Sequence, residues 1–143
     1  MFAINREEIR TEVEGELARL EAQVGLGQKV RVMVVHPHRP PIVDWVGTDY
    51  ASMYGTLGGP PERVALEEGV DLYCNEYGKL LGLTANRALF VGEEERPWDV
   101  VAGTFLVMGA DEGTGDQIDL TDEALKKYFK IFEDPICRWG YRP

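Results

Sequence analysis

The chain has 143 residues, of which 44% are hydrophobic, and a formal net charge of −10 with an isoelectric point of about 4.6. This length suits one compact domain with its own core. The acidic balance argues against binding to a nucleic-acid backbone, which needs clustered Lys and Arg. No apolar run approaches the roughly 20 residues that span a bilayer, and residues 1–10 lack the apolar core of a signal peptide. We therefore expect a cytoplasmic protein.

The acidic charge leaves three kinds of function open: a highly soluble protein, a binder of basic surfaces, and a mimic of nucleic acid. A mimic would carry carboxylates in rows at phosphate-like spacing. The chain interleaves 15 basic residues with its 25 acidic ones, which weakens that interpretation.

An amphipathic helix is predicted over residues 6–24. Apolar residues recur along one face at spacings of three and four, namely Ile9, Val13, Leu17, Leu20 and Val24. Asn5 is the expected N-cap of this helix. We divide the chain into a helical appendage, residues 1–28, and one α+β domain, residues 29–143. The helix either docks on its own domain, which is the favoured alternative, or pairs with a second copy in a homodimer.

The first half of the domain is predicted to contain two strands at 30–35 and 42–46 and a helix at 48–57. The proline-rich segment His36–Pro41 forms a rigid connection between the strands, because prolines cannot supply ladder donors. Thr48 or Asp49 caps the helix. The Gly-Gly-Pro-Pro run at 58–61 then breaks the chain.

The second half is predicted to be mainly sheet, with strands at 63–66, 70–74, 88–91 and 100–108. Residues 76–79 are expected to form a turn, with Gly78 able to take a positive φ. Gly103 indicates a bulge or a close backbone approach inside the last of these strands.

A C-terminal helix is predicted over residues 121–132, with Thr121 as its N-cap. Its expected apolar side consists of Leu125, Tyr128, Phe129 and Phe132. The fold class is therefore α+β, a mostly antiparallel sheet with an N-terminal amphipathic helix, a short middle helix and a C-terminal helix.

None of the sequence motifs indicates catalysis. The Gly-rich segments lack the lysine of a phosphate loop, and the acidic loop 111–119 has Asp116 where a calcium loop requires glycine. His36 and His38 would need a third ligand, such as Asp44, to hold a metal. We predict no catalytic residue, no metal and no cofactor, and hence a protein that is not an enzyme.

Two cysteines are too few for a disulfide framework. Cys74 lies in a strand-like run and is expected to be a small buried apolar group. A bridge to Cys137 is disfavoured in a reducing cytosol.

The best candidate site brackets an apolar stretch between Asn75 and Arg87. Polar residues on turns of a rigid scaffold often contact ligands, and a guanidinium binds carboxylate or phosphate in a bidentate manner. We predict that Asn75, Tyr77, Asn86 and Arg87 bind a small anionic, nucleotide-like ligand. The structural alternative is that Asn75 forms an Asx turn, Asn86 caps backbone groups and Arg87 pairs with an internal acid such as Asp99.

Several segments resemble the DUF3846 family. The strongest are Cys-Asn-Glu-Tyr-Gly-Lys-Leu-Leu-Gly-Leu at 74–83 and Ala-Gly-Thr-Phe at 102–105, with Asp99 before it. The resemblance covers roughly residues 30–132. Members look like proteins of bacteria, phages and mobile elements, which implies an accessory role in host takeover or counter-defence. The resemblance names no role for any residue.

We predict a non-enzymatic accessory protein of a phage or mobile element that binds a host or phage protein through an acidic surface. Two alternatives stay open: a protein that binds a small anionic ligand, and a DNA mimic that acts against restriction or another defence. Loss of binding in Arg87→Ala would support the ligand alternative, and unchanged partner capture would favour the protein surface. Direct nucleic-acid binding and membrane association are not expected.

Overall fold

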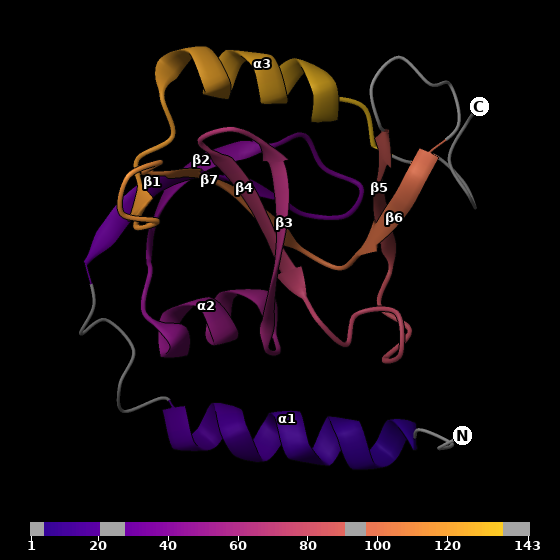
Figure 1. Ribbon diagram of the computed structural model, residues 1–143. Coiled ribbons are helices and arrows are strands. Elements are labelled where there is room, and N and C mark those ends of the chain that lie inside the picture. The colour runs from indigo at the N-terminus through magenta and orange to yellow at the C-terminus, as the bar shows by residue number, and fades with distance from the viewer. Residues whose placement is uncertain (1–4, 21–27, 91–96, 136–143) are drawn as a thin grey trace.

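The computed structural model describes residues 5–20, 28–90 and 97–135. They form stacked layers, which Figure 1 shows from α3 at the top, through the main sheet and α2, to α1 at the bottom. The helices are α1 (Arg6–Leu20), α2 (Tyr50–Leu57) and α3 (Asp122–Phe132). The predicted α+β class, with N-terminal, middle and C-terminal helices and antiparallel sheets, is confirmed.

The main sheet has six strands in the order β2–β1–β7–β4–β3, with β8 paired to the end of β7. Its strands are β1 (Lys29–Val35), β2 (Ile42–Gly47), β3 (Pro61–Glu67), β4 (Val70–Asn75), β7 (Phe105–Ala110) and β8 (Gln117–Ile118). All paired strands run antiparallel. The two edges of the sheet are therefore β2 and β3.

Side chains alternate along the strands, so the sheet has two apolar faces. Met33 and Val35 of β1 point to the face that α3 covers. Val32 and Val34 point to the opposite face, which α2 covers. The core thus lies in two layers on either side of the sheet.

A second, two-stranded sheet pairs β5 (Ala85–Phe90) with β6 (Pro97–Ala102). It lies beside the end of α3 in Figure 1. Leu89 and Val101 from these strands join Phe105 in the core beneath α3. Burial of this apolar surface holds the small sheet to the main one.

The caps of α2 and α3 are the expected residues. Asp49, rather than Thr48, begins α2, because its carboxylate accepts a hydrogen bond from the Ser52 amide at 3.0 Å. Thr121 begins α3 by accepting from the Ala124 amide at 3.1 Å. Each cap satisfies an amide that the helix itself leaves free.

Helix α1 packs on α2 of the same chain, as the favoured alternative predicted. Ile9, Val13 and Leu20 are buried against Ala51 and Tyr54. Burial of the Tyr54 hydroxyl raises its pKa to about 12. Val24, the last apolar residue of the predicted helix, lies outside the described residues.

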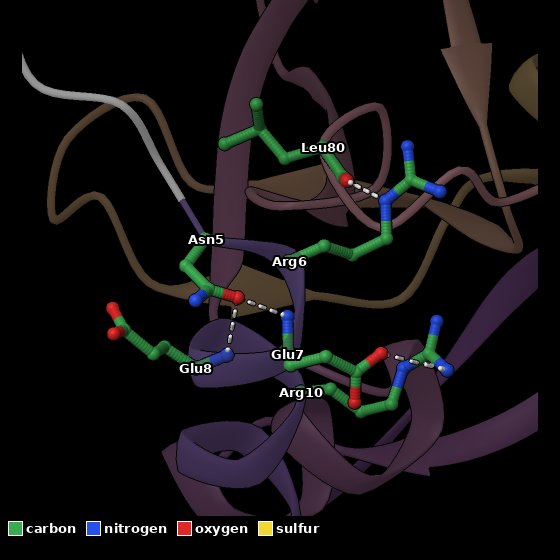
Figure 2. Close-up of polar contacts among 6 residues, drawn as sticks. All are labelled: Asn5, Arg6, Glu7, Glu8, Arg10 and Leu80. Carbon is green, nitrogen blue, oxygen red and sulfur yellow. Dashed lines mark hydrogen bonds and ion pairs between the residues drawn. The ribbon is translucent and has the colours of Figure 1, made fainter.

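The start of α1 is fixed by polar contacts (Figure 2). Asn5 caps the helix, because its side-chain oxygen accepts from the amides of Glu7 at 2.9 Å and Glu8 at 3.3 Å. Arg6 Nε donates to the Leu80 carbonyl at 3.1 Å. The guanidinium of Arg6 also lies over Gly82, whose φ of +71° requires glycine. These contacts join α1 to the segment that follows β4.

The prediction of a single strand over residues 100–108 is wrong. β6 ends at Ala102 and β7 begins at Phe105. Between them Gly103 has a φ of +86°, and the chain passes from the small sheet to the main one. A Cβ atom at Gly103 would lie 2.8 Å from the Leu83 side chain, so the close approach at this glycine is made by a side chain and not by another backbone segment.

Three further expectations need correction. Gly78 does not have a positive φ. Glycine is needed at this position because a Cβ atom would lie 2.6 Å from the Ala102 carbonyl oxygen. Phe129 is 43% exposed instead of facing the core, whereas Ala124 is buried. The short β8 was not expected, since two residues carry no periodic pattern.

Within the described residues, no helix has the length and apolar character needed to cross a membrane.

Candidate functional site

Arg87 on β5 has a buried guanidinium surrounded by backbone carbonyls. Its Nε donates to the Phe132 carbonyl at 2.9 Å, and its Nη2 donates to the Arg39 carbonyl. Its Nη1 donates to both oxygens of Asn86, at 3.2 Å and 2.7 Å. Burial lowers the pKa of Arg87, and the charge of Asp134 opposes that effect. Arg87 thereby ties β5 to the end of α3 and to the loop after β1.

Asn86 is also completely buried. Its Nδ2 donates to the carbonyls of Val35 and Gly103, both at 2.9 Å. The amide therefore bridges the end of β1 and the crossing into β7. Asp99, the acid expected beside Arg87, pairs instead with Lys79.

Asn75 ends β4 and forms the expected Asx turn, because its Oδ1 accepts from the Tyr77 amide at 2.8 Å. Its Nδ2 donates to the Leu57 carbonyl at 3.3 Å. A Cβ atom on Gly59 would lie 2.5 Å from the same Oδ1, so only glycine fits beside it. Tyr77 is half-buried and packs against the cluster between α1 and α2.

The four residues predicted to bind a ligand thus lie in two places. Asn86 and Arg87 lie in the interior between β1 and α3, and Asn75 and Tyr77 lie beside α2. The polar groups of both asparagines and of Arg87 bond to the protein itself. This arrangement accounts for the three residues as structural, and their ligand role stays a prediction.

Thr104 was missed by the sequence analysis. Its Oγ1 lies 2.8 Å from His36 Nδ1, and Thr104 lines a cavity of about 340 Å³ between the end of α2 and the start of β7. The two residues are 68 positions apart and meet because Val35 pairs with Phe105 across β1 and β7. No local pattern in the sequence signals such a pair.

Among the described residues, no three His, Cys, Asp or Glu side chains gather closely enough to hold a metal ion. Cys74 is half-buried beside the core beneath α3, and burial raises the pKa of its thiol to about 11. Cys137, to which a bridge was disfavoured, lies outside the described residues, so the absence of that bridge stays a prediction.

An acidic cleft of about 560 Å³ lies at the β3 side of the molecule, between the β3–β4 turn and the loop after β7. Five carboxylates and one guanidinium line it, those of Glu67, Glu68, Asp71, Asp111, Glu112 and Arg63. The turn and the loop meet because Val70 of β4 pairs with Gly109 of β7. The cleft therefore depends on pairing between distant strands.

Three of these carboxylates already have partners within the protein. Asp71 pairs with Arg63 at 2.8 Å, and Glu67 pairs with Lys127 of α3 at 2.8 Å. Asp111 accepts the amides of Gly113 and Thr114, which lower its pKa. These contacts shape the walls of the cleft.

Glu68 and Glu112 both line the cleft and interact directly with each other. A hydrogen bond that protonated Glu112 donates to the Glu68 carboxylate, and then the charge of Glu68, raise the pKa of the Glu112 carboxyl. In the part of the chain that the structure describes, neither residue forms an ion pair with a basic side chain. Two like charges held together disfavour their own ionisation, and a bound cation would relieve that repulsion. The site is thus suited to an ammonium or guanidinium group.

A family model matches residues 30–133, described as a domain of unknown function (DUF3846). The chain belongs to the DUF3846 family. The match includes the main sheet, the small sheet, α2 and α3, and it begins after α1. Asn75, Asn86 and Arg87, with their buried contacts, therefore lie within the DUF3846 domain, as does the acidic cleft. Comparison with curated proteins and with solved structures finds no match.

Proposed function

We propose that this DUF3846 protein is a non-enzymatic accessory protein of a phage or mobile element that binds a host or phage protein through its acidic cleft. The bound element is a Lys- or Arg-bearing segment of the partner. The observation that carries the proposal is the Glu68–Glu112 pair in the wall of a concave, acidic cleft. Unlike most surface carboxylates, Glu112 is held beside a second carboxylate that makes its ionisation more costly, and a cationic side chain removes that cost.

The shape of the charged surface favours a protein segment over DNA mimicry. The carboxylates of the cleft surround a concavity instead of forming a row along a flat face. A cavity of about 560 Å³ accommodates one or two long side chains and the adjacent backbone. The small-anion alternative has less support, since Arg87 and Asn86 already donate hydrogen bonds to backbone carbonyls.

The test is calorimetric titration of the full chain with a hexa-arginine peptide at low salt. We expect the double variant Glu68→Gln, Glu112→Gln to weaken binding by about tenfold, because the cleft loses both of the carboxylates that repel each other. The matched control is Glu8→Gln with Glu14→Gln on α1, which removes the same charge from exposed positions.

The control should change affinity by about twofold or less, since screened charges outside the cleft act only at long range. Equal weakening by both double variants would mean that net charge alone drives binding, and the proposed role of the cleft would then be wrong.

A further inference from the structure

The two edges of the main sheet differ in how they are protected against pairing with another strand. The β3 edge begins at Pro61, carries Glu62, Arg63 and Glu67, and has a bulge before Glu67. Proline, charged side chains and bulges are the features that keep sheet edges from pairing. The β3 edge is therefore blocked.

The β2 edge has less of this protection. Ile42, Val43 and Trp45 are 49%, 54% and 55% exposed, and Asp44 is the only charged residue of the strand. The Trp45 amide donates to the Asp44 carboxylate at 2.8 Å, so this amide points away from β1 and towards the open edge. The Val43 amide also points towards the open edge, because the direction of the backbone amides alternates from one residue to the next along a strand. An exposed, apolar strand edge is a template for another strand, whose carbonyl would replace the Asp44 carboxylate at the Trp45 amide.

Two of the exposed side chains of β2 share one face of the sheet. Val43 and Trp45 pair with Met33 and Arg31 of β1 and so lie on the face that α3 covers. Arg31 also forms an ion pair with Asp122 at 3.0 Å, so the start of α3 contacts β1, the neighbour of β2. Seven residues after Asp122, and hence on the same side of the helix, lies the exposed Phe129.

We propose that β2 pairs antiparallel with β2 of a second copy of this chain, across a two-fold axis perpendicular to the sheet. Such an axis continues each face of the sheet into the same face of the partner, so Val43 and Trp45 lie beside the same residues of the second copy. Charge supports a second copy as the occupant. The strand carries one carboxylate per copy, whereas the acidic cleft lies at the opposite edge. A register centred on Val43 or on Trp45 keeps the two Asp44 side chains from facing each other.

This interface differs from the homodimer through the N-terminal helix considered from the sequence. The apolar face of α1 is buried on α2 of its own chain. The proposal is also independent of the function proposed for the cleft, because the two surfaces lie on opposite edges of the sheet.

The test is sedimentation velocity of the full chain across micromolar concentrations. We expect the wild type to have about twice the chain mass of 16.1 kDa. Trp45→Lys should raise the dimer dissociation constant by at least about tenfold, because it places two like charges near the axis. The control, Ile131→Lys, changes a side chain of nearly equal exposure, 54%, on α3 and should leave the dimer intact.

Val43→Pro is the second variant, and it probes the backbone directly. Proline removes the outward amide of Val43, which an isolated edge strand tolerates but intermolecular pairing does not. We expect a monomer with an unchanged circular dichroism spectrum. A wild type that stays monomeric at the highest concentration, or a dimer that survives both substitutions in β2, would overturn the proposal.

Discussion

Arg87 illustrates how a charged residue serves the fold from a buried position. Its guanidinium donates to the carbonyls of Arg39, Asn86 and Phe132. These carbonyls lie in the loop after β1, in β5 and at the end of α3. The planar fork of donors suits this task, because each direction meets a different carbonyl. Buried carbonyls that lose their donor cost free energy, so the contacts of Arg87 are expected to matter for stability.

We expect Arg87→Ala to lower the free energy of unfolding by about 3 kcal/mol, because several buried carbonyls lose their donor at once. The free energy of unfolding of Arg87→Lys should lie between those of Arg87→Ala and the wild type, since a single ammonium cannot reach all of these carbonyls. Urea unfolding measures both. A variant as stable as the wild type would show that the guanidinium is not needed by the fold, and the ligand role would then regain support.

Glu112 provides a prediction with a defined pH dependence. Its pKa is raised in the folded protein above the ordinary 4.5, by Glu68. A raised carboxyl pKa means that the folded state prefers the protonated form, so this contribution to stability is present at low pH and is lost as pH rises through the raised value. Glu112→Gln should therefore melt at a higher temperature than the wild type at neutral pH.

The difference in melting temperature between Glu112→Gln and the wild type should vanish below the ordinary carboxyl pKa, where both side chains are neutral. Thermal melts at several pH values test this dependence. A difference that stays constant with pH would show that Glu112 is not repelled by Glu68.

At the scale of elements, local patterns predicted most helices and strands. The caps Asp49 and Thr121 and the β-branched run of β1 carry signals within a few residues. The division of residues 100–108 was not predictable, because its apolar run continues across the break. Only contact with Leu83 and the change of sheet define the turn at Gly103.

The docking of α1 gives a prediction about Tyr54. Val13→Asp places a carboxylate in the apolar contact with α2, and we expect a loss of about 3 kcal/mol in unfolding free energy or local release of α1. Release would let the pKa of Tyr54 fall from about 12 towards its ordinary value of 10, since burial is the main cause of the shift. Titration of phenolate absorbance follows this change.

Ala18→Asp is the matched control for α1, because it adds the same charge at an exposed position of the same helix. It should leave the Tyr54 titration unchanged. If Val13→Asp also left it unchanged, the contact between α1 and α2 could not be the cause of the shift.

At the scale of the whole molecule, the acidic character was predictable and the cleft was not. Composition gives the net charge of −10, but Glu68 and Glu112 come together only through the pairing of β4 with β7. The position of β2 at the edge of the sheet was likewise not predictable, because the residues of a strand do not show which strands it pairs with. The ligand role of Asn86 and Arg87 stays a prediction, and the sequence could not show that backbone carbonyls surround the two side chains.

The two proposed surfaces fit together in one assembly. A dimer through β2 leaves both acidic clefts free, because they lie at the far edges of the joined sheet. Two linked clefts would bind a partner with repeated basic segments more tightly than one cleft does.

The most direct test of the central claim is an NMR titration of the full, ¹⁵N-labelled chain with a hexa-arginine peptide. The amide signals of Ala65, Gly69 and Gly115, which line the cleft, should move furthest, and those of Glu8 and Glu14 on α1 should move little. Shifts spread evenly over the acidic residues of α1 and the cleft would contradict the account, as would the absence of shifts at the cleft.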